Sequence, residues 1–311
     1  MHARIRLGRG FRAAARGLDP RLPHAPAEQG SAPARARPSH PDLNGGALVA
    51  ARAVPTLAGR RRAAVPPLAQ LGVQVSVVIP TLNEADNLPY VLARLPEGLH
   101  EVIIVDGRST DGTVDIAQRL RPDIRALIQT GRGKGNALAT AFRACTGDIV
   151  VTLDADGSTD PAEIPRFVGA LCAGADFVKG SRFAQGGASS DITRVRRLGN
   201  LALNALVNGL YRTNFTDLCY GYNAFWAHCL PYMRVDCDGF EVETLVNVRV
   251  AKAGLVIHEV PSFEHDRLSG ASNLRAVRDG SRVLLTILRE RASAAWWLHV
   301  LAERRRGGHS E

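Results

Sequence analysis

The sequence has few cysteines, few aromatic residues and no long apolar run, and these shortages exclude several classes of protein. The five cysteines are odd in number and have neither CxxC spacing nor nearby histidine pairs. A disulfide framework and a zinc site are therefore poor interpretations, and a reducing compartment is expected. A bilayer-spanning helix needs about 20 predominantly apolar residues. The run most worth testing, residues 198–211, has 14 residues and contains three asparagines, so no spanning segment is expected.

The basic charge of the chain is confined to one end. The net charge is +9, and residues 1–72 carry twelve arginines, no lysine and three acidic residues, whereas the remainder has 27 basic and 27 acidic residues. Segment 1–72 is rich in Ala, Arg, Pro and Gly and is expected to be disordered, because it has too little apolar surface to offset chain entropy. It lacks the apolar stretch of a secretory signal. This segment has three alternative interpretations: a solvated arm, a translated stretch upstream of the true start, or an arm that contacts an anionic membrane surface.

From residue 73 onward, short β-branched runs alternate with amphipathic stretches, which is typical of βαβ units and a mainly parallel sheet. Strands are expected at residues 73–80, 101–106, 124–128, 148–154 and 176–180, and helices at 84–95, 111–121, 135–144 and 161–172. Asp111 offers a helix N-cap, and Pro161 suits the first helical turn after Asp160. We expect one α/β domain over residues 73–290 and a basic, amphipathic extension over 291–311.

Polar clusters follow four of the expected strands, at the ends where open α/β sheets bind their ligands. They are PTLNE (80–84), DGRSTD (106–111), GRGKG (131–135) and DAD (154–156). Because the four clusters converge on one edge of the sheet, they predict a single site.

Asp154 and Asp156, on either side of Ala155, project two carboxylates from a strand end. Oxygen ligands at this spacing suit Mg²⁺ or Mn²⁺, which keeps its other positions for water and a diphosphate. A DxD triplet also arises by chance among turn-forming aspartates, but its position after an apolar strand and beside three other clusters favours the metal site.

Lys134 lies between Gly133 and Gly135, where the backbone can approach a phosphate and an ammonium can balance its charge. The glycines are equally compatible with a tight turn. The segment matches neither GxxxxGK[ST] nor GxGxxG, so the sequence gives little support to an ATPase or a hydride-transfer enzyme. Asp106 is expected either to accept from a base or ribose edge or to cap the following turn.

These motifs resemble a known family. VSVVIPTLNEADNL (75–88), IIVDGRSTDGT (103–113), GRGKGNAL (131–138), LDADGSTDP (153–161) and KGSRF (179–183) resemble family 2 glycosyltransferases of GT-A fold. DLCYGYNAFW (217–226), GFEVETLVNVRVAKAG (239–254) and EVPSFEHDRLSGASNL (259–274) resemble the polyprenyl-phosphate sugar transferases, the dolichyl-phosphate mannosyltransferase type. The resemblance covers nearly all of residues 73–290.

The resemblance implies roles for individual residues. The donor, a GDP- or UDP-linked sugar, would be lined by Pro80, Thr81, Asn83 and Glu84, with Asp106 near its base. Asp154 and Asp156 would hold the metal against the diphosphate. Arg182, Arg196 and Arg267 would surround the acceptor phosphate, whose oxygens suit arginine forks. Two departures, Ser158 where those transferases usually have Gln and Gly107 where many relatives have Asp, leave the sugar and the base open.

The expected reaction is a metal-dependent inverting transfer to a polyprenyl phosphate. A lipid phosphate is already ionised and needs no base, whereas a soluble hydroxyl acceptor, the alternative, would need one. Glu241 and Glu243 are the candidate bases, and because they are two residues apart on an expected helix, at most one points into the site. Their alternative is a solvated helix start favoured by the helix dipole.

Two apolar stripes have helical spacing. The first is Val195, Leu198, Ala202, Ala205 and Gly209, and the second is Leu274, Val277, Ser281, Leu284 and Leu288. Core packing is the preferred interpretation of the first, and a surface in the lipid headgroup layer is the alternative for both. Trp296 and Trp297 before Arg304, Arg305 and Arg306 resemble an interfacial anchor. We therefore expect a cytoplasmic protein, peripheral at the inner face of the cell membrane.

A basic nucleic-acid-binding protein with a degenerate α/β domain is a remote alternative, motivated by the arginines of residues 1–72. The rest of the chain is charge-balanced, and an aromatic content of 5% offers little for base stacking. No nucleic-acid partner is therefore expected.

Overall fold

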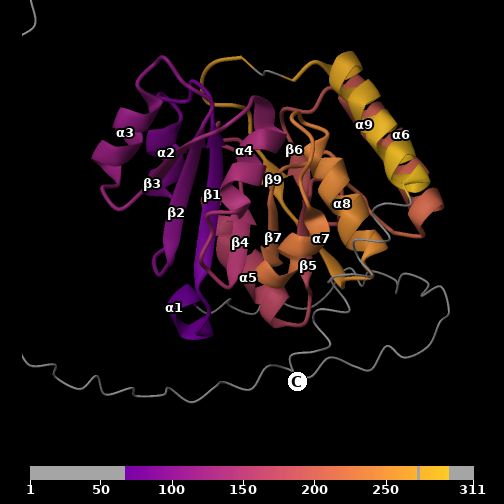
Figure 1. Cartoon of the computed structure of the whole chain (residues 1–311), viewed down its shortest axis with the longest axis horizontal. Helices are drawn as coiled ribbons and strands as arrows, with labels where there is room; N and C mark the ends of the chain where they lie inside the picture. The colour runs from indigo at the N-terminus through magenta and orange to yellow at the C-terminus, as the bar shows by residue number, and fades with distance from the viewer. Residues whose placement is uncertain (1–66, 272–273, 294–311) are drawn as a thin grey trace, which may run out of the picture. The chain divides into compact units, whose positions relative to one another are not determined.

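The computed structural model describes residues 67–271 and 274–293 (Figure 1). The expectations for residues 1–66 and for 294–311, Trp296 and Trp297 included, lie outside the described residues. Folded structure begins before residue 73, because Leu68–Leu71 form helix α1 and Leu68 is buried. At the other end, the last described helix runs to Ala292.

A seven-stranded sheet organises the fold, in the order β3-β2-β1-β4-β7-β5-β8. Its strands are β1 Val75–Thr81, β2 Glu101–Asp106, β3 Arg125–Ile128, β4 Ile149–Thr152, β5 Phe177–Ser181, β7 Asn223–Trp226 and β8 Ile257–Pro261. All neighbours are parallel except β7, which is antiparallel to both β4 and β5. The mainly parallel α/β fold expected from the sequence is confirmed, and all five expected strands form within a few residues of their expected bounds.

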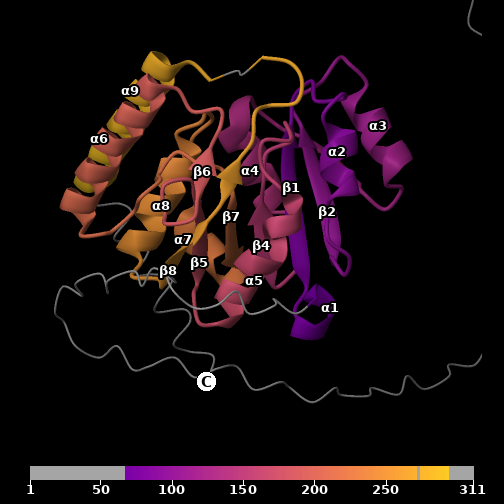
Figure 2. The same cartoon turned by 180° about the vertical axis from the view of Figure 1, so that it is seen from behind.

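Helices cover both faces of the sheet (Figures 1 and 2). They are α2 Leu88–Ala93, α3 Thr113–Leu120, α4 Gly133–Phe142, α5 Ile164–Cys172, α6 Arg194–Tyr211, α7 Leu230–Met233, α8 Val242–Lys252 and α9 Ala276–Ala292. One buried core joins α1, α2, α3 and α5 to one face of the sheet. A second joins α4, α6, α7, α8 and α9 to the opposite face. The strands read as continuous apolar runs because both of their faces are buried.

The helix starts follow local sequence signals, with one difference. Asp160 accepts a hydrogen bond from the Ala162 amide at the start of the 3₁₀ turn Pro161–Glu163, as expected for an N-cap before proline. The N-cap of α3 is Gly112, not Asp111. Asp111 nevertheless accepts from the Thr113 amide and hydroxyl and from the Ala85 amide, so it ties the start of α3 to the loop after β1.

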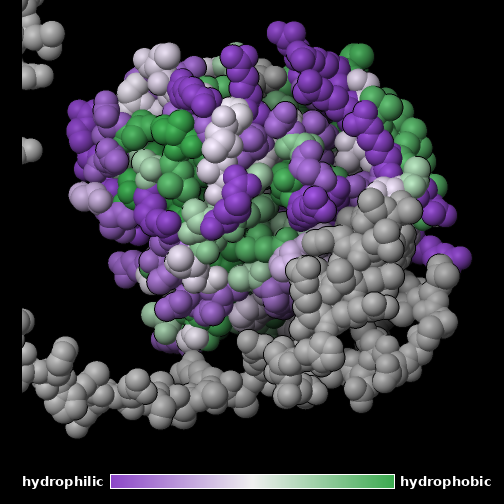
Figure 3. Space-filling model, viewed as in Figure 1, coloured by the Kyte–Doolittle hydropathy of each residue, from purple (hydrophilic) through white to green (hydrophobic). Residues whose placement is uncertain are grey.

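The apolar stripes of α6 and α9 lie on the surface. Helices α6 and α9 lie side by side, and Figure 3 shows hydrophobic side chains at the edge of the molecule that they form. Every member of the first stripe is exposed, with Val195 at 70% and Leu198 at 67%, so the preferred interpretation as core packing was wrong. The second stripe is exposed from Val277 to Leu288. Helical spacing identified these faces correctly but carries no information on what covers them.

No described helix is both long enough and apolar enough to cross a bilayer. A second, two-stranded sheet pairs β6 (Ala188–Ser189) with β9 (Phe263–Glu264) in parallel. An isolated bridge joins Thr159 to Glu264. These pairings bring the segment after β8 next to the turn that follows Asp156.

Candidate active site

A cavity of about 760 Å³ lies at the carboxyl ends of the parallel strands and takes its walls from every polar cluster singled out in the sequence. Pro80, Thr81 and Glu84 come from the end of β1, Lys134 from α4, and Asp154 to Asp156 from the turn after β4. The far end is lined by the first turns of α6 and α9. Its volume is in the range of sites for small ligands and cofactors.

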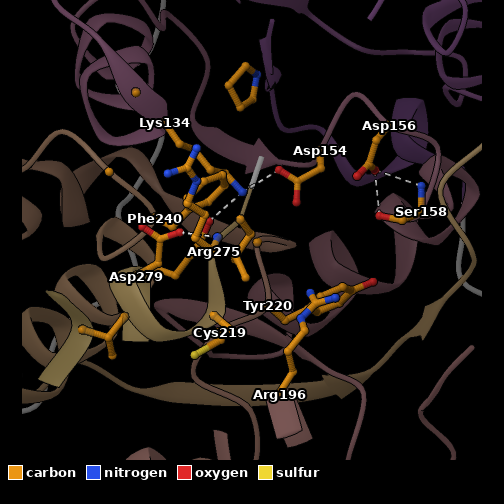
Figure 4. Close-up of a pocket in the computed structure, with 18 of the residues that line it drawn as sticks. Lys134, Asp154, Asp156, Ser158, Arg196, Cys219, Tyr220, Phe240, Arg275 and Asp279 are labelled. Carbon is orange, nitrogen blue, oxygen red and sulfur yellow. Dashed lines mark hydrogen bonds and ion pairs between the residues drawn. The ribbon is translucent and has the colours of Figure 1, made fainter. Parts of the chain in front are cut away.

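The two aspartates after β4 face the cavity in different ways (Figure 4). Asp154 is paired with Lys134, whose Nζ lies 2.5 Å from Asp154 Oδ1. Asp156 accepts hydrogen bonds through Oδ1 from the Ser158 amide and hydroxyl, at 3.0 and 2.7 Å. Ser158, noted above as a departure from the family pattern, therefore fixes the orientation of the second carboxylate.

Lys134 pairs with two carboxylates at once. Its Nζ lies 2.8 Å from Glu243 Oε1 as well as next to Asp154, and its side chain is 12% exposed. Burial alone would lower the pKa of Lys134, but the charges of Asp154 and Glu243 outweigh burial and raise that pKa above its ordinary value. Lys134 is therefore a permanent cation at neutral pH.

The glycines beside Lys134 are required by packing. A Cβ at Gly133 would lie 2.2 Å from the Asp238 carbonyl oxygen, and one at Gly135 would lie 2.2 Å from the Cys237 carbonyl oxygen. The Gly135 amide donates to the Asp238 carbonyl at 2.8 Å. The glycines therefore allow the backbone of residues 237–239 to pack closely against the start of α4, while Gly133 and Lys134 also line the cavity.

Arg267 is the second cationic side chain that forms an ion pair with one of the two aspartates. Its Nη1 lies 3.2 Å from Asp156 Oδ2, its Nη2 donates to Glu84, and its Nε donates to the Ser269 carbonyl. Burial raises the pKa of Glu84, although the hydrogen bonds from Asn87 and Arg267 oppose the shift. Arg267 thus links the nucleotide side of the expected site to the metal side.

The residues expected to line the nucleotide divide into two groups. Pro80, Thr81 and Glu84 lie on the cavity wall, whereas Asn83 and Asp106 are not among its lining residues. Asp106 accepts from the Ser109 amide and hydroxyl and from Thr81 Oγ1. Asn83 has φ +55° and accepts from the Thr110 amide. In this structure both residues shape the loop that follows β2, which is the capping alternative considered for Asp106.

Arg182 lies on the cavity wall, but its side chain is only 3% exposed and is held by two carboxylates. It donates to both oxygens of Asp217 through Nε and Nη2 and to both oxygens of Glu264 through Nη1. All three guanidinium nitrogens thus donate to carboxylates. Its expected contact with an acceptor phosphate stays a prediction. The hydrogen bonds to Asp217 and Glu264 leave few N–H groups of Arg182 to donate to a phosphate.

The partners of Arg182 were missed in the sequence. Asp217 and Glu264 fall within motifs that resemble the family, yet their spacing gives no sign that both meet one arginine. The available signal was chemical, because an arginine at the end of a buried strand requires acidic partners. Arg196, the remaining acceptor candidate, lines the cavity and pairs with Asp191 at 2.9 Å.

Glu241 and Glu243 point in different directions, as their spacing requires. Glu243 lines the large cavity, and Glu241 lies instead beside a smaller pocket with Arg282 and accepts from the Gly239 amide. Glu243 is therefore the one of the two that is placed to meet a ligand in the large cavity.

Asp154 and Asp156 are the candidate residues for holding a metal ion. Among the described residues no group of three or more His, Cys, Asp or Glu side chains is arranged to hold one. Mg²⁺ commonly takes one or two carboxylates and completes its shell with water and phosphate oxygens. The Asp154 and Asp156 carboxylates line the same cavity and fit that pattern.

Comparisons with known proteins agree with this geometry. The profile of glycosyl transferase family 2 matches residues 76–234. Glycosyltransferase AglJ of Haloferax volcanii is 33% identical over 69% of this chain and 71% of its own length. Undecaprenyl-phosphate mannosyltransferase of Micrococcus luteus is 32% identical over 72% of this chain and 96% of its own.

A similar solved structure is glucosyl-3-phosphoglycerate synthase from Mycobacterium tuberculosis, in complex with Mn²⁺, UDP-glucose and phosphoglyceric acid. It is 26% identical, covers 77% of this chain and 88% of its own, and has a TM-score of 0.62. The resemblance to family 2 transferases, the polyprenyl-phosphate type included, is thereby confirmed. The chain belongs to glycosyl transferase family 2 and is a glycosyltransferase.

Proposed function

We propose that this glycosyltransferase moves a sugar from a GDP- or UDP-linked donor to a polyprenyl phosphate, using Mg²⁺ or Mn²⁺ and inverting the anomeric carbon. The observation that carries the proposal is the extent of the cavity. It runs from Asp154 and Asp156 to the first turns of α6 and α9, where Val195 and Val277 line it and are exposed. A donor diphosphate suits the first end, and an acceptor with an apolar tail suits the second.

At the donor end, Asp154 and Asp156 would hold the cation. When bound there, a divalent cation neutralises charge on the departing nucleoside diphosphate. Lys134 and Arg267 now neutralise the same two carboxylates. As the donor enters, these two side chains would turn from the aspartates to diphosphate oxygens and hold the leaving group.

At the acceptor end, an oxygen of the phosphate monoester would attack the anomeric carbon from the face opposite the leaving group. The new bond joins that oxygen to the anomeric carbon, and the bond to the nucleoside diphosphate breaks with its electron pair leaving on the diphosphate. No proton moves, because the attacking oxygen is already ionised near neutral pH. The protein therefore needs to position the acceptor and has no need of a base.

The relative named undecaprenyl-phosphate mannosyltransferase supports this acceptor. The exposed stripes of α6 and α9 support a peripheral contact with the inner face of the cell membrane, with the catalytic cavity open to the cytoplasm. A leucine that leaves water gains about 1.5–3 kcal/mol, so a few such residues suffice for reversible attachment.

A soluble hydroxyl acceptor is the second candidate. It is favoured by the similarity to glucosyl-3-phosphoglycerate synthase, a structure that holds phosphoglyceric acid. In that case Glu243, which lines the cavity, would serve as the base, and Glu241 would not.

One assay separates the two candidates. The full chain is given a panel of GDP- and UDP-linked sugars with Mn²⁺, and with undecaprenyl phosphate in detergent, with 3-phosphoglycerate, or with neither. Transfer to the lipid that survives Glu243→Gln supports the first candidate. Transfer to the soluble acceptor alone, lost in Glu243→Gln, contradicts it and supports the second.

A further inference from the structure

The end of the cavity farthest from α6 and α9 contains a buried amide side chain. The carboxyl ends of β1, β2 and β3 meet at this end, and Figure 1 shows these strands on the side of the sheet opposite α6 and α9. Leu82, Gly107 and Gln129 each follow directly after one of these strands, and all three line the cavity. We refer to these three residues as the β1–β3 corner.

Gln129 is buried, but its side chain contributes no hydrogen bond to the fold. The residue is 5% exposed, and its backbone amide donates to the Asp106 carbonyl at 3.1 Å. Within the described ranges, 67–271 and 274–293, its side-chain amide has no hydrogen-bond partner. A buried amide without a partner lowers stability, because it has given up its hydrogen bonds to water. Folding therefore does not account for a glutamine at this position, whereas a ligand that pairs with the amide does.

The polar side chains next to the corner are engaged by the loops themselves. Asp106 accepts hydrogen bonds from Ser109 and Thr81 and does not line the cavity. Arg108 donates to two backbone carbonyls in the loop after β3. Neither side chain is directed at a ligand in the corner.

The corner is too crowded for the second aspartate that many members of the family have after the first. This chain has Gly107 there, and a Cβ at Gly107 would lie 3.2 Å from Leu82 Cδ1 and 3.3 Å from the Thr81 carbonyl oxygen. Leu82 is 43% exposed and gives the corner an apolar wall. The corner thus presents an amide beside an apolar surface, where relatives have a carboxylate.

The order of groups along the cavity indicates which part of the donor lies in the corner. The proposed metal ligands Asp154 and Asp156 follow β4, and the acceptor is proposed to bind on the side of α6 and α9. The sugar has to lie between the diphosphate and the acceptor, so the nucleoside extends the other way, toward β1, β2 and β3. A flat base against Leu82 suits the corner, because ligand sites combine apolar walls with a few placed polar groups.

We propose that Gln129 is the residue that recognises the base of the donor, and that it pairs with an imide edge, a ring N–H beside a carbonyl. Uracil and guanine both have this edge. The amide oxygen accepts from uracil N3–H or guanine N1–H, and the amide nitrogen donates to the neighbouring carbonyl oxygen. The inference rests on the proposed function. It moves base recognition from Asp106, where the family resemblance placed it, to a residue that the sequence did not single out.

Five nucleotides test this contact in the wild type. UDP and GDP have the imide edge, UDP methylated at N3 and GDP methylated at N1 have lost its N–H, and inosine diphosphate keeps the edge but lacks the 2-amino group of GDP. Each is titrated by calorimetry into the full chain with Mn²⁺. For each parent that binds, the methylated form should bind about 10-fold more weakly or worse, since the amide oxygen meets a methyl group. Inosine diphosphate should bind as GDP does.

The decisive variant is Gln129→Glu. A carboxylate accepts from guanine N1–H and the 2-amino group together, whereas it repels the carbonyl oxygen of uracil. The ratio of GDP affinity to UDP affinity should therefore rise by about 10-fold or more. Inosine diphosphate, without the amino group, should not share this gain. Gln118→Glu makes the same substitution at an exposed position of α3 and should keep the wild-type ratio.

The outcomes separate the contact from the proposed function. Equal affinity for a parent nucleotide and its methylated form overturns the role of Gln129, and so does a GDP-to-UDP ratio that Gln129→Glu leaves unchanged. If circular dichroism shows that Gln129→Glu does not fold, the methylated nucleotides decide with the wild type alone. A wild type that binds none of the five nucleotides refutes the proposed function itself.

Discussion

Arg267 Nη1 lies 3.2 Å from Asp156 Oδ2, although 111 residues separate the two in the chain. Lys134 holds Asp154 in the same way from α4. Both carboxylates of the aspartate pair are therefore paired with a cationic side chain. A divalent cation needs the same oxygens, so its entry requires these side chains to move, and a diphosphate offers them new partners. We therefore expect the metal and the donor to bind cooperatively.

Replacing Lys134 tests this exchange of partners. Lys134→Met leaves Asp154 and Glu243 without their shared cation, and the repulsion between them favours a divalent ion. Mn²⁺ should bind several-fold more tightly in the absence of nucleotide, while UDP in the presence of Mn²⁺ should bind roughly 10-fold more weakly, as expected for one lost charged contact. Titration calorimetry of both ligands measures the two changes.

Arg119→Met is the matched control, because Arg119 is exposed on α3 and donates to a carbonyl of its own helix. Both affinities should match the wild type there. If Lys134→Met leaves metal and UDP affinity unaltered, Lys134 does not act as a counter-ion at the donor site.

Arg182 should be required for stability. Its removal leaves Asp217 and Glu264 buried without a cation, and breaking a buried ion pair in this way costs about 3–5 kcal/mol. Arg182→Ala should therefore lose several kcal/mol in urea denaturation. Arg196→Ala, which removes a partly exposed pair with Asp191, should lose about 1 kcal/mol or less. An Arg182→Ala protein of normal stability that fails to bind farnesyl phosphate would instead assign Arg182 to the acceptor, as the family resemblance implied.

Gly221 leaves no space for a side chain at the donor site. A Cβ there would lie 2.5 Å from Lys134 Nζ, 2.9 Å from Asp154 Oδ2 and 3.0 Å from Glu243 Oε1. Gly221→Ala should displace this group of charges and reduce Mn²⁺-dependent UDP binding by calorimetry. Gly209→Ala, at an exposed site on α6 with no atom within 4 Å, should bind UDP normally and gain up to about 1 kcal/mol of stability. Equal UDP affinity in both variants would contradict the claim that a side chain at position 221 displaces the charged groups of the donor site.

The exposed faces of α6 and α9 should attach the protein to lipid. Leu198→Glu/Leu284→Glu places two charges on those faces and should lower binding to vesicles of phosphatidylcholine and phosphatidylglycerol by 10-fold or more, since each leucine gains roughly 1.5–3 kcal/mol on burial. Leu120→Glu, at a 52% exposed leucine on α3, is the control. Cosedimentation measures the bound fraction. Unchanged cosedimentation of the double variant would remove α6 and α9 from the contact.

Strand periodicity made much of the fold predictable. The apolar runs that end at Thr81, Asp106 and Thr152 form strands because both faces of the sheet are covered, and parallel pairing brings their polar ends together. Strand β7 was not anticipated. It enters the sheet antiparallel between β4 and β5, and a four-residue run such as Asn223–Trp226 carries too little periodicity to place it.

The candidate site was predictable as a set of residue types but not as a set of contacts. The position of each motif after a strand predicted that its polar residues share one site, and Asp154, Asp156, Lys134 and Glu84 do line one cavity. Their partners depend on packing between segments far apart in the chain, so neither Arg267 with Asp156 nor Arg182 with Glu264 could be read from spacing. The same reason explains why the stripe at Val195 and Leu198 was assigned to the core.

The central claim is that Asp154 and Asp156 hold a divalent cation against a departing nucleoside diphosphate. It is tested most directly by measuring transfer from GDP- and UDP-linked sugars to undecaprenyl phosphate as Mn²⁺ is titrated, in the wild type, in Asp156→Asn and in the exposed control Asp123→Asn. The account predicts saturable Mn²⁺ dependence in the wild type and control and a loss of about 100-fold or more in Asp156→Asn, from the several kcal/mol that a bound cation supplies. Transfer that proceeds equally in Asp156→Asn, or without any divalent cation, would contradict it.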